Sequence, residues 1–207
     1  MAYRLKKHIL LSIYVFGFLT FGAATLGRAN VSAPVDTSST VVKAMNLTTY
    51  QSWGYTVDST AQGTRVRNLI LQLKALGFNH LTFNVRAKMI TGTTDTVVSF
   101  VPLHEQATEE RLLEETIEFA HSHGMTTGLR PILLVVGPRG EFPYTKSGVT
   151  WWHGNIAPAN PALWFQSLRT FHERYLQLAK RKGVSQYTIG AELHSMVTGL
   201  GERRSRA

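Results

Sequence analysis

A single carboxylate ends an apolar run late in the chain. The run Tyr187–Leu193 reads YTIGAEL, and Glu192 is its one charged residue. Burying an unpaired carboxylate costs on the order of several kcal/mol, so Glu192 needs a cationic partner or a chemical task at a strand end. A carboxylic acid at a strand end can serve as general acid and base. The alternative is a structural ion pair with Arg86 or Arg130, which also end predicted strands.

Other side chains suited to a polar ligand follow predicted strands. Tryptophan faces stack on sugar rings, and amides or imidazoles in the same loops can hydrogen-bond hydroxyl groups. Tryptophans in long loops can equally pack the loop down, and the residues ending the second strand can orient Glu192 instead of touching ligand. The candidate ligand-binding residues are Trp53, Asn84, Arg86, Trp152, His153 and Asn155.

Composition and motifs exclude three other kinds of site. The formal net charge is +9, but residues 1–29 hold four cations and no acid, and residues 202–207 hold three cations and one acid. The remaining 15 cations and 12 acids form no basic stripe of the kind that binds nucleic acid. No phosphate-binding glycine loop occurs, and the histidines lack carboxylates or cysteines at metal-ligand spacing. The sequence predicts no nucleic acid partner, no cofactor and no metal.

Alternating helices and strands must position these residues. Strands are predicted over 41–48, 80–89, 125–136 and 185–193. Helical spacing of apolar residues predicts three helices between them. The expected caps are Ser59 or Thr60, Thr108, and Asn160 followed by Pro161, and the expected ends are Gly77, Gly124 and Gly183. Trp164 and Phe165 are both expected to pack in the core.

The element order β-α-β-α-β-α-β predicts a parallel sheet covered by helices. The long loops, over 88–107 and 137–159, follow strands, where function gathers in such folds. The turn TTYQSWGY after the first strand is aromatic, which favours a (β/α)8 barrel over a nucleotide-binding doubly wound sheet. Eight units need about 250 residues. The predicted fold class is therefore a (β/α)8 TIM-barrel type, truncated to about the first four β/α units.

The first 29 residues have the order of an export signal. Arg4, Lys6 and Lys7 precede an uncharged apolar run over 9–26, and Gly27-Arg28-Ala29 offers a cleavage site. An uncleaved membrane anchor is the alternative, and only then is a membrane partner expected. The small polar residues 30–40 predict a linker. The chain is expected to be exported, periplasmic or extracellular.

The stretch from Trp151 to Met196 holds an ordered set of motifs. They are the loop Trp152-His153-Gly154-Asn155-Ile156, the helix opening Trp164-Phe165, the turn Gly183-Val184 and the strand end Gly190-Ala191-Glu192-Leu193. This order resembles clan A glycoside hydrolases and is most similar to the family-113 β-mannanases. MNLTTYQSWGY, LKALGFNHLTFNV and AHSHGMTTGLRPIL agree more loosely, so the likeness spans about residues 43–200.

The resemblance implies a retaining hydrolase of a β-linked, mannan-like polysaccharide. Glu192 would protonate the leaving oxygen and then activate water, while a second carboxylate about 5–5.5 Å away attacks the anomeric carbon. In that family the nucleophile follows the seventh strand, so we expect a fragment without the nucleophile and without turnover on its own. Asp95, Glu105 and Glu141 lie on loops of the same face, but none matches the family nucleophile. Ala191 stands where many clan members have a sugar-contacting asparagine, so the identity of that contact is open.

The expected organisation is a signal peptide or anchor over 1–29, a linker over 30–40, the N-terminal half of a (β/α)8 glycoside hydrolase domain over 41–201, and a truncated basic tail over 202–207. The expected partner is an oligo- or polysaccharide. A non-catalytic module that binds carbohydrate or a protein partner is the alternative, and titration with manno-oligosaccharides followed by a search for products distinguishes the two.

Overall fold

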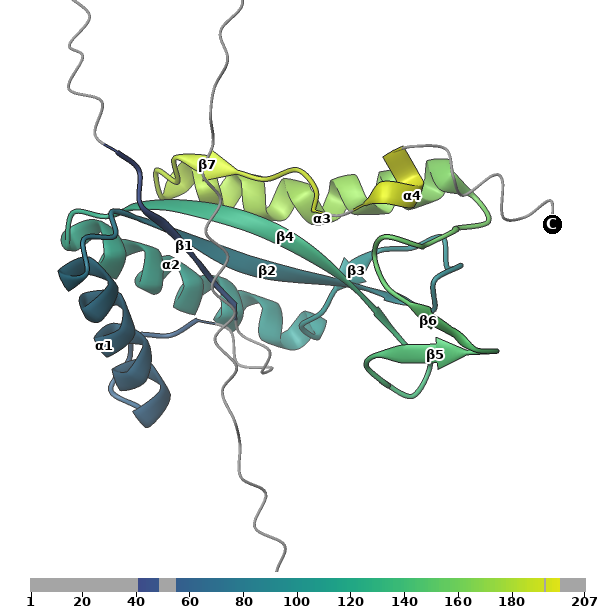
Figure 1. The fold of residues 1–207 in the computed structure, drawn as a ribbon, viewed down its shortest axis with the longest axis horizontal. Helices are drawn as coiled ribbons and strands as arrows, with labels where there is room; N and C mark the ends of the chain where they lie inside the picture. The colour runs from purple at the N-terminus through teal and green to yellow at the C-terminus, as the bar shows by residue number, and fades with distance from the viewer. Residues whose placement is uncertain (1–40, 49–54, 192, 198–207) are drawn as a thin grey trace, which may run out of the picture. The chain divides into compact units, whose positions relative to one another are not determined.

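The computed structural model describes residues 41–48, 55–191 and 193–197 (Figure 1). The main elements are β1 (Ala44–Leu47), α1 (Ala61–Ala75), β2 (His80–Ile90), α2 (Gln106–Ser122), β4 (Thr126–Val136), α3 (Pro161–Arg181), β7 (Gln186–Tyr187) and α4 (His194–Val197). The predicted signal segment, the linker, Trp53, Glu192 and the C-terminal tail lie outside the described residues. Among the helices that are described, none is long and apolar enough to cross a membrane.

The main sheet has the strand order β1-β2-β4-β7, and each of these neighbours is parallel to the next. Strands that are consecutive in this series are therefore adjacent in space. A doubly wound sheet reverses its strand order at a switch point, whereas a β/α barrel does not. The predicted barrel-type fold class is confirmed, with four β/α units in sequence.

The fourth strand is shorter than predicted. Instead of spanning 185–193, β7 pairs only Gln186 and Tyr187 with β4. The backbone N–H of Thr188 still donates to the Leu129 carbonyl at 2.9 Å, and regular pairing ends there. Gly190 follows two residues later, and glycine weakens a strand that is paired on one edge.

The long loops after β2 and β4 contain small elements of their own. β3 (Val98–Ser99) pairs antiparallel with β2, and the 3-10 turn η1 (Leu103–Glu105) runs directly into α2. β5 (Tyr144–Lys146) and β6 (Val149–Trp151) form a hairpin. Because η1 already supplies the preceding turn, α2 begins at Gln106, and the predicted cap at Thr108 is wrong.

The other predicted helix boundaries are confirmed. The Thr60 hydroxyl accepts from the Gly63 N–H at 3.1 Å, and the Asn160 side chain accepts from the Leu163 N–H at 3.2 Å, so both cap their helices. The glycines expected to end the helices have left-handed backbones, with φ of +85°, +68° and +63° at Gly77, Gly124 and Gly183.

The two faces of the sheet differ in chemistry. Odd-numbered residues of β2, such as Phe83 and Met89, join the apolar faces of the helices in one buried core. The opposite face, called the inner face below, carries the even-numbered residues of β2 and β4, from His80 to Lys88 and from Thr126 to Leu134. It is rich in polar groups, whereas the interior of a β/α barrel is usually filled by branched apolar side chains.

Trp164 and Phe165 do not share one environment. Trp164 is fully buried and donates from Nε1 to the sulfur of Met89 at 3.1 Å, which links α3 to β2. Phe165 is 46% exposed, so the expectation that both residues pack in the core is wrong for Phe165. Adjacent helical positions point about 100° apart, which separates the two side chains.

Candidate functional site

Asn84 lies on the inner face of β2 and is held from two sides. Its side-chain amide donates to the hydroxyl of Thr48, and its backbone N–H donates to the Tyr55 hydroxyl at 2.8 Å. Tyr55 in turn donates to the carbonyl of Leu47, so its hydroxyl links the end of β1 to β2. The Asn84 Oδ1 atom is buried and has no hydrogen-bond partner among the described residues. An orphaned acceptor of this kind is suited to a ligand hydroxyl.

Arg86 lies one inner-face position further along β2. Its guanidinium carbon lies 4.5 Å from the centre of the Phe100 ring, and the Lys88 ammonium lies 5.5 Å from the same ring. The Lys88 ammonium also donates to the Phe100 carbonyl at 3.4 Å. Burial lowers the pKa of Arg86, with Glu109 opposing this shift. Phe100 therefore fixes two cations at the carboxyl half of β2.

The loop Trp152–Ile156 follows the β5–β6 hairpin and is rigidly built. The Asn155 side-chain oxygen accepts from the Trp152 N–H at 2.8 Å, and its amide donates to the Thr150 carbonyl at 3.0 Å. A Cβ on Gly154 would come within 2.2 Å of Cη2 of Trp152, so the indole lies directly over this glycine. Asn155 thus holds the loop, and Trp152 remains 47% exposed beside His153, whose ring lies 5.1 Å away.

This loop is fixed to the carboxyl end of β2. The Ala157 N–H donates to the Gly92 carbonyl at 2.8 Å, and a Cβ on Gly92 would lie 1.8 Å from the Trp151 ring. Gly92 follows the last residue of β2 by two positions. The loop therefore lies at the rim, while Arg86 is six residues earlier and at most about 20 Å below it along the strand.

The same loop also contacts the segment that carries Glu192. The Ser195 hydroxyl donates to the Ile156 carbonyl at 2.7 Å, and the Ser195 N–H donates to the Gly154 carbonyl at 3.3 Å. Glu192 lies outside the described residues, so its predicted chemistry stays a prediction. The two sequence motifs that suggested a sugar site are nevertheless neighbours at the carboxyl end of the sheet.

Two of the loop acids have structural partners. The Asp95 carboxylate accepts from the Asn160 N–H at 2.7 Å and supports the start of α3. The Glu141 carboxylate accepts from the Arg139 N–H at 2.9 Å within its own turn. Glu105 lies at the exposed end of η1 beside His104. The carboxylates of Asp95 and Glu141 therefore each accept a backbone hydrogen bond in the loop region at the carboxyl end of the sheet.

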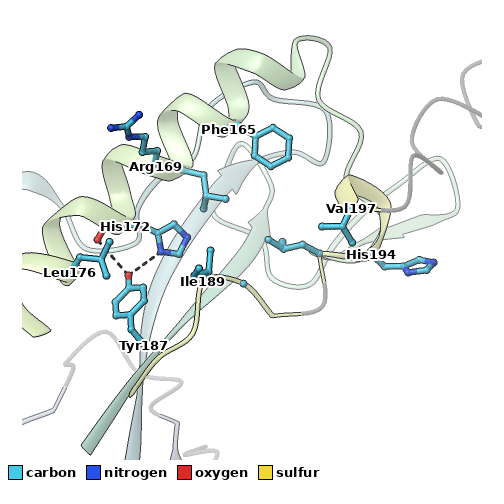
Figure 2. Close-up of a pocket in the computed structure, with 11 residues that line it drawn as sticks. Phe165, Arg169, His172, Leu176, Tyr187, Ile189, His194 and Val197 are labelled. Carbon is cyan, nitrogen blue, oxygen red and sulfur yellow. Dashed lines mark hydrogen bonds between the residues drawn. The ribbon is translucent and has the colours of Figure 1, made fainter. Parts of the chain in front are cut away.

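An apolar groove of about 750 Å³ lies elsewhere, between α3 and the segment after β7 (Figure 2). Figure 2 shows Phe165, His172 and Leu176 on α3 facing Tyr187 and Ile189. None of the predicted ligand-binding residues lines this groove. Tyr187 and His172 belong to the helix-covered face, and Gly190, Leu193 and His194, which flank Glu192 in the sequence, also line the groove.

The buried histidine in this groove predicts acid sensitivity. Burial lowers the pKa of His172, whose Nδ1 lies 2.9 Å from the Tyr187 hydroxyl. At pH values between this lowered pKa and the unfolded value of about 6.5, the unfolded chain binds more protons than the folded chain. The free energy of unfolding therefore falls as the pH drops through this window. We expect urea unfolding between pH 7 and 5 to lose up to about 1.4 kcal/mol per pH unit from this residue.

The variant His172→Gln should flatten that pH dependence. His104→Gln is the matched control because the His104 side chain is 80% exposed. An unchanged slope in His172→Gln would show that other groups cause the acid sensitivity.

Several contributors to the site were missed in the sequence. Lys88 could have been found, because strand alternation places it on the same face as Asn84 and Arg86. Phe100, Gly92 and Ser195 had no local signal, since their roles arise from contacts between segments distant in sequence.

Comparison with known proteins supports the fold. No protein-family model matches the chain, and no curated protein matches its sequence. A GH113 β-mannanase from Alicyclobacillus acidocaldarius, solved in complex with ManMIm, superposes with a TM-score of 0.53 at 18% identity, over 74% of this chain and 46% of that one. Two further GH113 β-1,4-mannanase structures superpose at 16% and 17% identity with TM-scores of 0.46 and 0.44, over 73% and 68% of this chain and 49% and 44% of theirs.

At this level of identity the first likeness concerns the fold alone. The chain spans less than half the length of that mannanase. The resemblance to family-113 β-mannanases that the sequence motifs suggested is confirmed at the level of the fold, and the described residues have a glycoside hydrolase-like (β/α) barrel fold over about its first four units.

Proposed function

We propose that this chain supplies the acid/base side of a retaining glycoside hydrolase that acts on a β-linked, mannan-like polysaccharide after export. Glu192 is the proposed acid and base. The residues proposed to contact the substrate, or to support those that do, are Trp53, Trp152, His153, Asn155, Asn84 and Arg86. The observation that carries the proposal is the contact of the exposed-tryptophan loop with the segment around Glu192, through Ser195 and the carbonyls of Gly154 and Ile156.

The chemistry needs a second carboxylate. In a retaining mechanism it lies about 5–5.5 Å from the acid/base and attacks the anomeric carbon. Of the 13 acids in the chain, Asp36, Glu192 and Glu202 lie outside the described residues, and the ten described acids all lie on helices, η1 or loops. In the family that the sequence resembles, the nucleophile lies near the end of the seventh strand. We therefore propose that the nucleophile is not among the described acids, and that Glu192 acts together with a carboxylate supplied from outside them.

Binding of mannohexaose tests the substrate side. We expect saturable binding by isothermal titration, weakened about tenfold or more in Trp152→Ala, because stacking on an aromatic face contributes on the order of 1–3 kcal/mol. Phe165→Ala is the matched control, since Phe165 is equally exposed but lies in the groove on the helix-covered face. Equal losses in both variants, or no binding by the wild-type chain, would refute this part of the proposal.

Product formation separates hydrolysis from binding alone. We expect no reducing ends from mannan with the 207-residue chain. Product that Glu192→Gln abolishes would support hydrolysis but contradict the absence of the nucleophile. Binding without product, even when a polypeptide with the remaining barrel strands is added, would favour the alternative, a carbohydrate-binding module that kept the aromatic loop.

A further inference from the structure

The charged side chains of the parallel strands are all positive, and they all lie on the same face of the sheet. β1, β2, β4 and β7 carry three lysine or arginine residues, Arg86, Lys88 and Arg130, and no aspartate or glutamate. Asn84 is the register partner of Arg130, and strand alternation places Arg86 and Lys88 on the same side as Asn84. All three cations therefore project from the inner face. The described acids are on helices, η1 and loops, so this segregation is specific to the sheet.

Arg130 is the most informative of the three. It is partly buried on β4, and it has no hydrogen-bond or ion-pair partner among the residues that the structure describes. A partly desolvated guanidinium normally keeps a carboxylate or phosphate partner. The orphaned, buried Oδ1 atom of Asn84 lies on the neighbouring strand at the same level. An anion next to a hydroxyl donor would satisfy both groups.

Lys88 extends this charge toward the rim. Its contacts with the Phe100 ring and carbonyl hold the ammonium in place, so a ligand need not order it. Arg86 is engaged in a further interaction of its own and is not one of the proposed ligand contacts. Below Arg130 the inner face carries uncharged Thr82, Gly128 and Thr126 and the buried His80. The charge thus begins mid-strand and rises toward the carboxyl end, where ligands enter β/α barrels.

We infer that the inner face binds an anionic sugar, a β-linked hexuronate, with Arg130 and Lys88 as its carboxylate contacts and Asn84 as acceptor for a neighbouring hydroxyl. This inference rests on the proposed carbohydrate function and specifies an acidic chain, in preference to a neutral one, as the ligand that binds more tightly. The cations lie from the middle of the strands toward the rim, whereas the inner face below them is uncharged. This placement toward the carboxyl end favours a soluble ligand over a carboxylate from another polypeptide.

A matched pair of sugars tests the inference. β-1,4-linked mannuronate hexamer and mannohexaose differ at C6, where a carboxylate replaces the hydroxymethyl group. By isothermal titration at about 50 mM salt, the full chain should bind the mannuronate hexamer about tenfold more tightly, the gain typical of one charged hydrogen bond. Because the contacts are partly exposed, this preference should shrink toward unity at about 0.5 M salt.

Single substitutions test which residues cause the preference for the mannuronate hexamer. Arg130→Met should remove most of it, and Arg130→Lys should retain part of it, while Arg111→Met is a charge-matched control on the exposed side of α2. Should circular dichroism show that Arg130→Met does not fold, Lys88→Met serves instead, with a partial loss of preference expected.

The outcomes distinguish this inference from the proposed function. Equal affinities for the two sugars, or a preference that Arg130→Met and Lys88→Met leave intact, would overturn the anionic site and leave mannan binding standing. Binding of mannuronate alone would support the site and overturn mannan as the substrate. Binding of neither sugar would overturn both, and a polypeptide carboxylate would then be the counter-ion of Arg130.

Discussion

Trp164→Ala should destabilise the chain by about 3–5 kcal/mol, the range measured for truncation of a fully buried tryptophan. The indole is inaccessible to solvent, belongs to the core shared by helices and strands, and donates to the Met89 sulfur at 3.1 Å. Its loss leaves a cavity between α3 and β2 that rigid neighbours cannot fill. Because whole domains are stable by only about 5–15 kcal/mol, this one change removes a large share of the total.

The neighbouring residue supplies the control. Phe165→Ala removes an aromatic ring of similar size at the next position, but that ring is 46% exposed, so we expect a loss of about 1 kcal/mol or less. The measurement is urea unfolding followed by far-ultraviolet circular dichroism, which does not depend on tryptophan emission. Losses of equal size in the two variants would show that α3 does not dock through Trp164.

The contrast between these two residues shows how far the sequence could predict the fold. Helical spacing, the caps Thr60 and Asn160, and the glycines after each helix are local signals, and they predicted element order and most boundaries correctly. The direction of a single side chain at a helix edge is decided by the neighbouring layer. Periodicity places both Trp164 and Phe165 near the apolar stripe, and only the packing of α3 on β2 buries the first and exposes the second.

The incorrect boundaries have the same origin. Thr108 is a plausible cap in isolation, but η1 begins the turn earlier, and the side chain of Gln106 fixes that start by donating to the Val101 carbonyl at 3.1 Å. The predicted strand over 185–193 is mainly apolar from Tyr187 onward, yet regular pairing stops at Tyr187. Pairing depends on a partner backbone, which an apolar pattern cannot reveal.

The candidate site was predictable in part. Asn84 and Arg86 could be placed by alternation, and the Trp152–Ile156 motif marked a loop at the correct end of the sheet. The internal hydrogen bonds of Asn155, the indole over Gly154 and the stacking of two cations on Phe100 could not be predicted. Each of these contacts is made within a loop or between segments whose backbone path must first be known.

The geometry of the sheet also depends on a charged seam between α2 and α3. Arg174 on α3 lies 3.3 Å from the Glu110 carboxylate and 3.5 Å from that of Glu109, and it donates to the Gln106 carbonyl at 2.5 Å. The Tyr175 hydroxyl donates to Glu109 at 3.0 Å. Burial raises the pKa of Glu109, while the Tyr175 hydrogen bond and the Arg174 charge act to lower it.

Arg174→Met should therefore destabilise the chain by about 2–4 kcal/mol at pH 7, somewhat below the usual cost of breaking a fully buried pair, because the Arg174 side chain is still 20% exposed. Without the cation the pKa of Glu109 rises further, so the variant should recover stability relative to wild type as the pH falls and this carboxylate takes up a proton in the folded state. Adding Glu109→Gln to Arg174→Met should restore part of the lost stability at pH 7, since it removes the unpaired buried charge.

Urea unfolding at pH 7 and pH 5 measures these differences. The control is Arg111→Met, which breaks an exposed ion pair on the same helix α2 and is expected to cost less than about 0.5 kcal/mol. A loss in Arg174→Met no larger than this control, or one independent of pH, would mean that water enters the seam and that apolar packing alone holds α3 beside α2 and β4.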